Sequence, residues 1–203
     1  MQESGSRLTR QQIDRLGNMS IFLAKNTYEP SKTKILKLVY LCEEWFVKKF
    51  ASPFIGLPFH AWQFGPVQKE LYVNLGVPEL EEGTSILANY IKPIDFGNKH
   101  FQISPLSEFN DDEFSDDEIA IMEQVASNYK YSEAKDLVFI THKLTSLWYK
   151  TVIRENGLIE RFDKSIQKTS ELQLDFSELL ESNKAKEFYL EQVEMLSFSN
   201  SLK

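Results

Sequence analysis

Residues 31–50 show the clearest alternation of apolar and polar positions in the chain, with the period of an amphipathic α-helix. The apolar face comprises Ile35, Leu38, Val39, Cys42 and Phe46, and the positions off that face are Lys34, Lys37, Glu44 and Lys48. We interpret the lysines of this segment, including Lys32 and Lys49, as a solvated face of the helix. The alternative interpretation is a small phosphate-binding patch.

Capping signals predict further helices. Thr9 with Gln12 forms a capping box that opens a helix ending near Asn26, and Ser115 with Glu118 forms a second box. Pro66 suits the first turn of a helix because its missing N–H has no partner there. Helical segments are therefore expected at residues 9–26, 31–50, 66–75, 115–126, 131–141 and 146–156, with an amphipathic stretch over 179–193.

Two segments have the character of β-structure. The segment 58–64 is short and rich in aromatic residues, and Gly65-Pro66 marks its end, so we predict that it is extended. Residues 91–96 and 100–104 flank Gly97-Asn98, a pair typical of a two-stranded hairpin.

These elements predict a mainly α fold, a compact multi-helix domain with a small β-hairpin or sheet element. The polar stretch 157–169 is the best candidate for a hinge. We therefore expect a helical domain over residues 1–156 and a C-terminal helical appendage over residues 157–203.

Composition and charge narrow the class of protein. The chain has 203 residues and a formal net charge of −7, which makes general nucleic-acid binding unlikely because phosphate contacts need a positive surface. No apolar run reaches the ~20 residues of a membrane span, and residues 1–9 lack a hydrophobic signal core. The single cysteine, Cys42, lies on an apolar helix face and suits a reducing compartment. We expect a cytoplasmic protein.

The search for catalytic chemistry finds little. The three histidines, His60, His100 and His142, are far apart and have no partners at metal-ligand spacing. An acidic run over residues 108–118 lacks the glycine of a calcium loop, and we interpret it as a solvated loop near a helix N-terminus or as a surface that meets a basic partner. We therefore predict no enzyme activity, no metal and no cofactor; a hydrolase that uses His142 is the minor alternative.

Aromatic residues concentrate between residues 40 and 72 of the chain. They are Tyr40, Trp45, Phe46, Phe50, Phe54, Phe59, Trp62, Phe64 and Tyr72. Most are expected in the core, and a minority would suit an exposed anchor for a protein partner.

The same block carries a family resemblance. Lys34-Ile-Leu-Lys-Leu-Val-Tyr-Leu41 is followed by Pro53, by Ala61-Trp62-Gln-Phe-Gly65-Pro66-Val67 and by Leu71-Tyr72. This order resembles the Panacea domain, in which a KLLKLLYLA helix leads to a Gly-x-Pro turn and an AWxxGPV motif. Residues 137–148, with Thr141-His142-Lys143 and Trp148, are similar to the family's later LTH…PW segment. Ala51-Ser52-Pro53 replaces the usual Gly-x-Pro, and Leu147 replaces the proline that usually precedes the tryptophan.

The resemblance covers about residues 11–154 and implies an antitoxin that neutralises a cognate protein toxin by direct binding. The alternative function is a proteolysis adaptor that delivers a client protein to a bacterial protease. The oligomeric state stays open. The motif residues carried over are Tyr40, Trp62, Gly65, Pro66, Tyr72, Thr141, His142 and Trp148. They either contact the partner or maintain the fold, and residues of these types favour the second interpretation.

Overall fold

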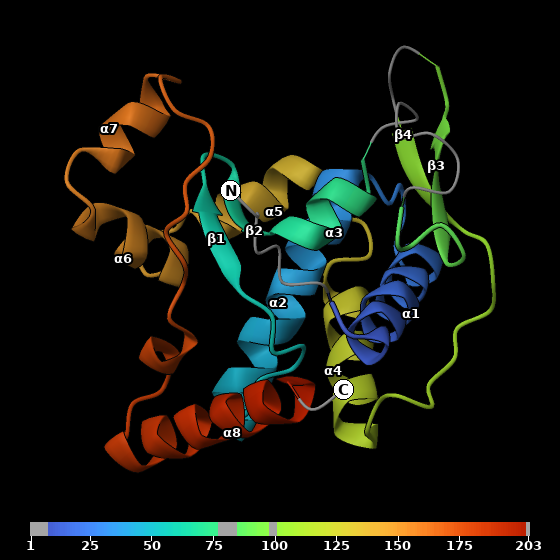
Figure 1. Ribbon diagram of the computed structural model, residues 1–203. Coiled ribbons are helices and arrows are strands. Elements are labelled where there is room, and N and C mark those ends of the chain that lie inside the picture. Colours follow the sequence, from blue (N-terminus) through green and yellow to red (C-terminus); the bar gives the residue numbers. More distant parts are fainter. Residues whose placement is uncertain (1–7, 77–84, 98–100, 202–203) are drawn as a thin grey trace, which may run out of the picture.

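Helix α2 (Lys32–Phe50) lies at the centre of the fold, and the other elements pack around it (Figure 1). The computed structural model describes residues 8–76, 85–97 and 101–201. Ser31 caps α2 by accepting a hydrogen bond from the backbone N–H of Lys34. The helix ends at Ala51, which adopts the left-handed conformation (φ 49°, ψ 40°). That conformation is the one that a glycine at a helix C-terminus favours.

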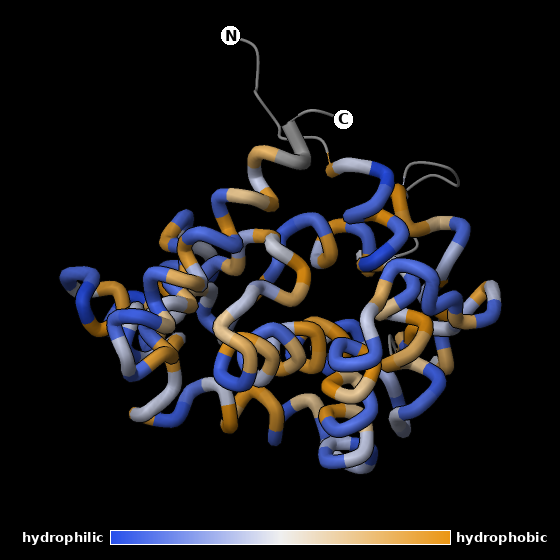
Figure 2. The backbone as a smooth tube through the Cα atoms, turned by 90° about the horizontal axis from the view of Figure 1, so that it is seen from below, coloured by the Kyte–Doolittle hydropathy of each residue, from blue (hydrophilic) through white to orange (hydrophobic). Residues whose placement is uncertain are grey.

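The helices on either side of α2 begin where the capping signals predict. The two capping boxes form at Thr9 and Ser115, at the starts of α1 (Arg10–Asn26) and α4 (Asp116–Asn128). Helices α5 (Ala134–Thr141), α6 (Leu147–Arg154), α7 (Leu158–Asp163), the 3-10 helix η1 (Phe176–Leu179) and α8 (Asn183–Ser201) complete the described helices of the second half. Hydrophobic and hydrophilic positions alternate along the helices (Figure 2), because the helices around α2 bury one side and expose the other.

Two antiparallel hairpins supply the β-structure. Strands β1 (Phe59–Trp62) and β2 (Gly65–Gln68) form one, and β3 (Ile91–Asp95) with β4 (Phe101–Pro105) forms the other. The second hairpin is where the sequence predicts it, although Asn98 and His100 lie outside the described residues. The prediction of a mainly α fold with a small β element is confirmed.

The prediction that a helix begins at Pro66 is wrong. Pro66 lies in β2, and the helix α3 (Lys69–Asn74) begins after Gln68. Pro66 pairs with Ala61, whose N–H donates to the carbonyl of Leu172 and whose carbonyl accepts from the Ser170 hydroxyl. Because Ala61 directs both backbone groups away from β2, the missing N–H of Pro66 removes no bond between the strands.

The solvated lysine face predicted for α2 is also wrong at two positions. Lys34 and Lys37 are only 2% and 1% exposed, although both stand off the most apolar face. Lys34 Nζ donates to the carbonyls of Tyr28 and Lys130, and Lys37 Nζ donates to the carbonyl of Pro66. A central helix is covered on several sides, so a residue off its apolar stripe is still buried.

The chain beyond α7 lies along β1. Leu172 accepts from the N–H of Ala61, and the N–H of Leu174 donates to the carbonyl of Phe59. Phe176 then packs its ring against Tyr40 and Phe59. The division into 1–156 and 157–203 stays a prediction. Within the described residues, no helix combines the length and the apolarity that crossing a bilayer requires.

Candidate functional site

The end of α5 and the start of α6 meet the tip of the β1–β2 hairpin, to which they are bonded over separations of 79 and 86 residues in the sequence. The indole Nε1 of Trp148 in α6 donates to the carbonyl oxygen of Trp62 in β1, at 2.9 Å. The Nε2 atom of His142, at the end of α5, lies 3.0 Å from the carbonyl oxygen of Gln63 in the hairpin turn. We name the cluster Lys37, Trp62, Gly65, Pro66, Thr141, His142 and Trp148 the motif junction.

Gly65 allows the hairpin to approach both α2 and α5 closely. Its φ is +98°, and a Cβ atom there would lie 2.7 Å from Thr141 Oγ1 and 2.9 Å from Lys37 Nζ. Both distances are too short for a carbon atom, and the backbone conformation is one that side chains with a Cβ rarely adopt. The glycine of the motif is therefore required by this contact as well as by the turn.

Lys37 supplies the buried amine of the motif junction. Its Nζ donates to the carbonyl oxygen of Pro66 at 2.9 Å, and burial lowers the pKa of the amine to about 7. A lysine without a carboxylate partner prefers its neutral form in such a place because the charged form loses its hydration. Lys37 is part of the sequence motif, but the helical pattern predicted that it faces solvent. One feature of the sequence could have indicated its burial. Lys37 has two apolar residues on each side, from Ile35 to Val39.

His142 joins α5 to the hairpin. Its Nδ1 lies 2.6 Å from the carbonyl oxygen of Val138, and its Nε2 faces that of Gln63. Both partners are acceptors, whereas a neutral imidazole carries a single N–H. Burial lowers the pKa of the ring, and the two carbonyl contacts oppose that shift. The ring also packs on Trp148, with centroids 3.9 Å apart. These contacts of His142 with two backbone carbonyls and with Trp148 tie α5 to the hairpin and to α6.

Of the remaining motif residues, some belong to the motif junction and one lies in the core. The rings of Trp62 and Tyr72 lie 4.8 Å apart, and Trp62 Nε1 donates to the carbonyl of Ser170. Tyr72 is therefore an extension of the motif junction. Tyr40 is separate, because its ring packs against Phe59 and Phe176 in the interior. Seven of the eight carried-over residues thus converge, and their role in partner binding stays a prediction.

A groove of about 570 Å³ opens beside the motif junction. Its lining residues are Gln63, Phe64, Val138, His142, Trp148, Tyr149, Ile159, Phe162 and Asp163. Phe64, in the hairpin turn, is 63% exposed, while Trp148 beneath the groove is 2% exposed. An apolar groove with an exposed aromatic residue at its edge is a suitable surface for anchoring a protein partner. In the sequence, Phe64 is one of nine aromatic residues between positions 40 and 72, and nothing local distinguishes it from the others.

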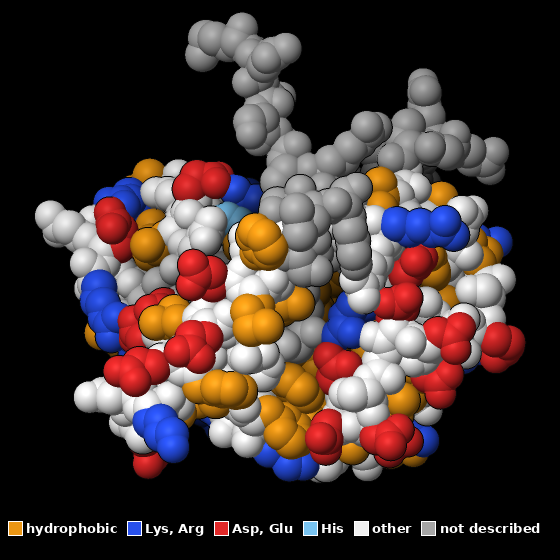
Figure 3. All heavy atoms as spheres, turned by 60° about the horizontal axis from the view of Figure 1, so that its bottom comes forward, with side chains coloured by type: hydrophobic (Ala, Val, Ile, Leu, Met, Phe, Trp, Pro, Cys, Tyr) orange, Lys and Arg blue, Asp and Glu red, His pale blue; other side chains and the backbone are white. Residues whose placement is uncertain are grey.

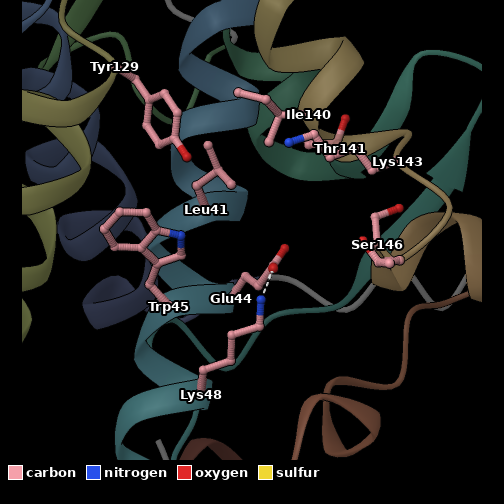
Figure 4. A pocket seen from close by; sticks show the side chains of 10 residues that line it. Leu41, Glu44, Trp45, Lys48, Tyr129, Ile140, Thr141, Lys143 and Ser146 are labelled. Atoms are coloured by element: carbon pink, nitrogen blue, oxygen red, sulfur yellow. Dashed lines mark hydrogen bonds and ion pairs between the residues drawn. The ribbon is translucent and has the colours of Figure 1, made fainter.

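Thr141 also borders a smaller cavity of about 190 Å³ between α2, α4 and the α5–α6 loop (Figure 4). Its walls include Trp45 and Tyr129, and the ion pair of Glu44 with Lys48 spans part of it. This cavity is more polar and less open than the groove. Across the described ranges of the chain, no three His, Cys, Asp or Glu side chains are grouped so that they could hold a metal ion.

The fold and the site define a class of mainly helical domain. In it, the lysine of a central helix and a Thr-His…Trp segment are hydrogen-bonded to a Trp–Gly–Pro hairpin beside an apolar groove. The family described as "Antitoxin SocA-like, Panacea domain" matches residues 35–149. The chain belongs to that family, as its motifs predicted. Comparison with curated proteins and with solved structures produced no match.

Proposed function

We propose that this protein is an antitoxin that neutralises a cognate protein toxin by binding it directly, in the cytoplasm of a bacterium. Membership of the SocA-like antitoxin family is the observation that carries the proposal. The role requires a binding surface and no chemistry, and so we propose that the protein is not an enzyme and uses no cofactor.

The groove beside the motif junction is the surface that we propose for toxin contact. Phe64 projects from a hairpin turn whose backbone is held by Trp148 and His142, so little conformational freedom is lost when a partner covers it. Exposed aromatic side chains over a rigid base commonly contribute most of the binding energy of an interface. We therefore assign the buried motif residues to supporting the groove and Phe64 to contact.

Growth rescue tests this assignment. The product of the neighbouring gene is expressed with the wild-type protein, with Phe64→Asp or with the control Phe96→Asp. Phe64 and Phe96 are 63% and 64% exposed, so both substitutions leave the core intact. We expect rescue by the wild type and by Phe96→Asp, and loss of rescue with Phe64→Asp. Equal rescue by both variants would show that the groove does not contact the toxin. No rescue by the wild type would contradict the proposed antitoxin function.

The alternative function is that of a proteolysis adaptor, and the same co-expression strains distinguish it from an antitoxin. An adaptor accelerates degradation of its client, whereas an antitoxin that acts by occlusion leaves the toxin present and bound. The half-life of the toxin is measured after translation is stopped, with and without this protein. A shorter half-life in its presence, abolished in a protease-deficient host, would identify the adaptor.

A further inference from the structure

Helix α8 presents an apolar stripe to solvent. Phe188, Met195 and Phe198 are 46%, 64% and 66% exposed. Their spacing of seven and then three residues places them along one side of the helix. Met195 and Phe198 also line a shallow depression of about 420 Å³ together with Glu191 and Glu194.

The opposite side of α8 is the one that attaches it to the body of the protein. Tyr189 is 7% exposed and borders a cavity that it shares with Glu43 and Phe176. Tyr189 lies about 100° from Phe188 around the helix and further from Met195, so the side of α8 that Tyr189 buries and the side that is most exposed are different.

An acidic stripe lies directly beside the apolar one. Glu187, Glu191 and Glu194 follow each other at spacings of four and three residues, so they share a side of the helix. Lys184 and Lys186 are confined to its first turn, and its last turn has no basic residue to offset the negative end of the helix dipole. Figure 3, in which the bottom of Figure 1 comes forward, shows hydrophobic side chains gathered on this face with carboxylates around them.

We propose that the outer face of α8, defined by Phe188, Glu191, Glu194, Met195 and Phe198, is a second docking surface, and that its partner is a basic amphipathic helix of another protein. The apolar stripe would receive the apolar side of such a helix, and the glutamates would pair with its lysines or arginines. The negative end of the α8 dipole would add to that attraction.

The acidic stripe also argues against two other occupants. A second copy of α8 would place glutamates against glutamates, and an anionic membrane surface would repel them. Helix α8 lies at the other end of the molecule from the turn of the β1–β2 hairpin, which carries Phe64 (Figure 1). The proposal therefore does not depend on toxin binding at the groove beside the motif junction.

Fluorescence anisotropy with designed peptides tests the proposal on the full-length protein. The probe is a labelled 19-residue peptide, the length of α8, with leucine and lysine at the spacing of an amphipathic helix. A matched peptide carries glutamate in place of each lysine. We expect the basic peptide to bind, with an affinity that falls as salt is added, and the acidic peptide not to bind.

Three variants locate the binding. Glu191→Lys combined with Glu194→Lys should weaken the basic peptide about tenfold or more and allow the acidic one to bind. Met195→Ser combined with Phe198→Ser should weaken the basic peptide by about tenfold. The control Phe139→Ser changes a 70% exposed residue on α5 and should leave binding unchanged.

Two results would overturn the proposal. One is binding of the basic peptide that is unaffected by the charge reversal. The other is a dimer in sedimentation velocity that Met195→Ser with Phe198→Ser abolishes, which would assign the face to a second copy of the chain. Unchanged toxin rescue by Phe64→Asp would count against the groove alone and would leave the peptide result unaffected.

Discussion

Replacement of Gly65 by alanine tests whether the hairpin is held as closely as the structure requires. The added methyl group would lie 2.7 Å from Thr141 Oγ1 and 2.9 Å from Lys37 Nζ, so either these two buried side chains or the hairpin must shift. Overpacking of this kind costs about 1–3 kcal/mol. The positive φ of +98° costs about 1–3 kcal/mol more for a residue with a Cβ atom.

Gly97 provides a matched control for the backbone effect. Its φ is +96°, and among the described residues nothing lies within 4 Å of the position of its Cβ atom. Gly97→Ala should therefore carry only the conformational cost. The difference in free energy of unfolding between Gly65→Ala and Gly97→Ala should be about 1–3 kcal/mol, which isolates the steric contact.

Urea denaturation followed by far-UV circular dichroism measures both variants, provided that the m-value is unchanged. A second check combines Gly65→Ala with Thr141→Ala, because removing the hydroxyl relieves the shortest contact. The double variant should be more stable than the sum of the single effects predicts, with a coupling of about 0.5–3 kcal/mol. If Gly65→Ala costs no more than Gly97→Ala, the close approach of hairpin and helices is refuted.

Three further predictions concern other parts of the molecule. Trp148→Phe leaves the carbonyl of Trp62 without its donor and should lower the free energy of unfolding by about 1–3 kcal/mol; an unchanged urea midpoint would contradict this. Ala51→Gly should raise the free energy of unfolding by about 0.5–1 kcal/mol, because Ala51 holds a left-handed conformation at the end of α2. A lower urea midpoint for this variant would show that Ala51 is not strained there. Lys37 has a pKa of about 7 when folded and an ordinary value of 10.5, so the unfolded state binds more protons between these values and stability rises with pH across that window. Lys37→Met should reduce this rise by up to about 1.4 kcal/mol per pH unit, and parallel pH profiles of the two proteins would show that the amine is not buried.

Local signals in the sequence predicted the beginnings of the helices well. The capping boxes at Thr9 and Ser115 form as expected because each depends on side chains within three residues of the backbone that they cap. The hairpin around Gly97 has the same local origin. Such interactions depend on neighbours in the chain, so the order of residues is enough to identify them.

Pro66 shows where local reasoning fails. A proline is compatible with the first turn of a helix and with a strand position that needs no N–H bond. The second environment exists only because the chain near Leu172 and Ser170 takes up the backbone groups of Ala61. Those residues are more than 100 positions away, as the separation of 109 between Ser170 and Ala61 shows.

The sequence by itself determined the helical class, the helix caps and the motifs that identify the family, because periodicity, capping and residue order are local properties. Only the tertiary structure decided that Lys34 and Lys37 are buried, that the hairpin meets α5 and α6, and that Phe64 is exposed beside a groove. Burial depends on which distant segments cover a residue. An amphipathic pattern shows which side of a helix is most apolar, but it does not show how many of its sides are covered.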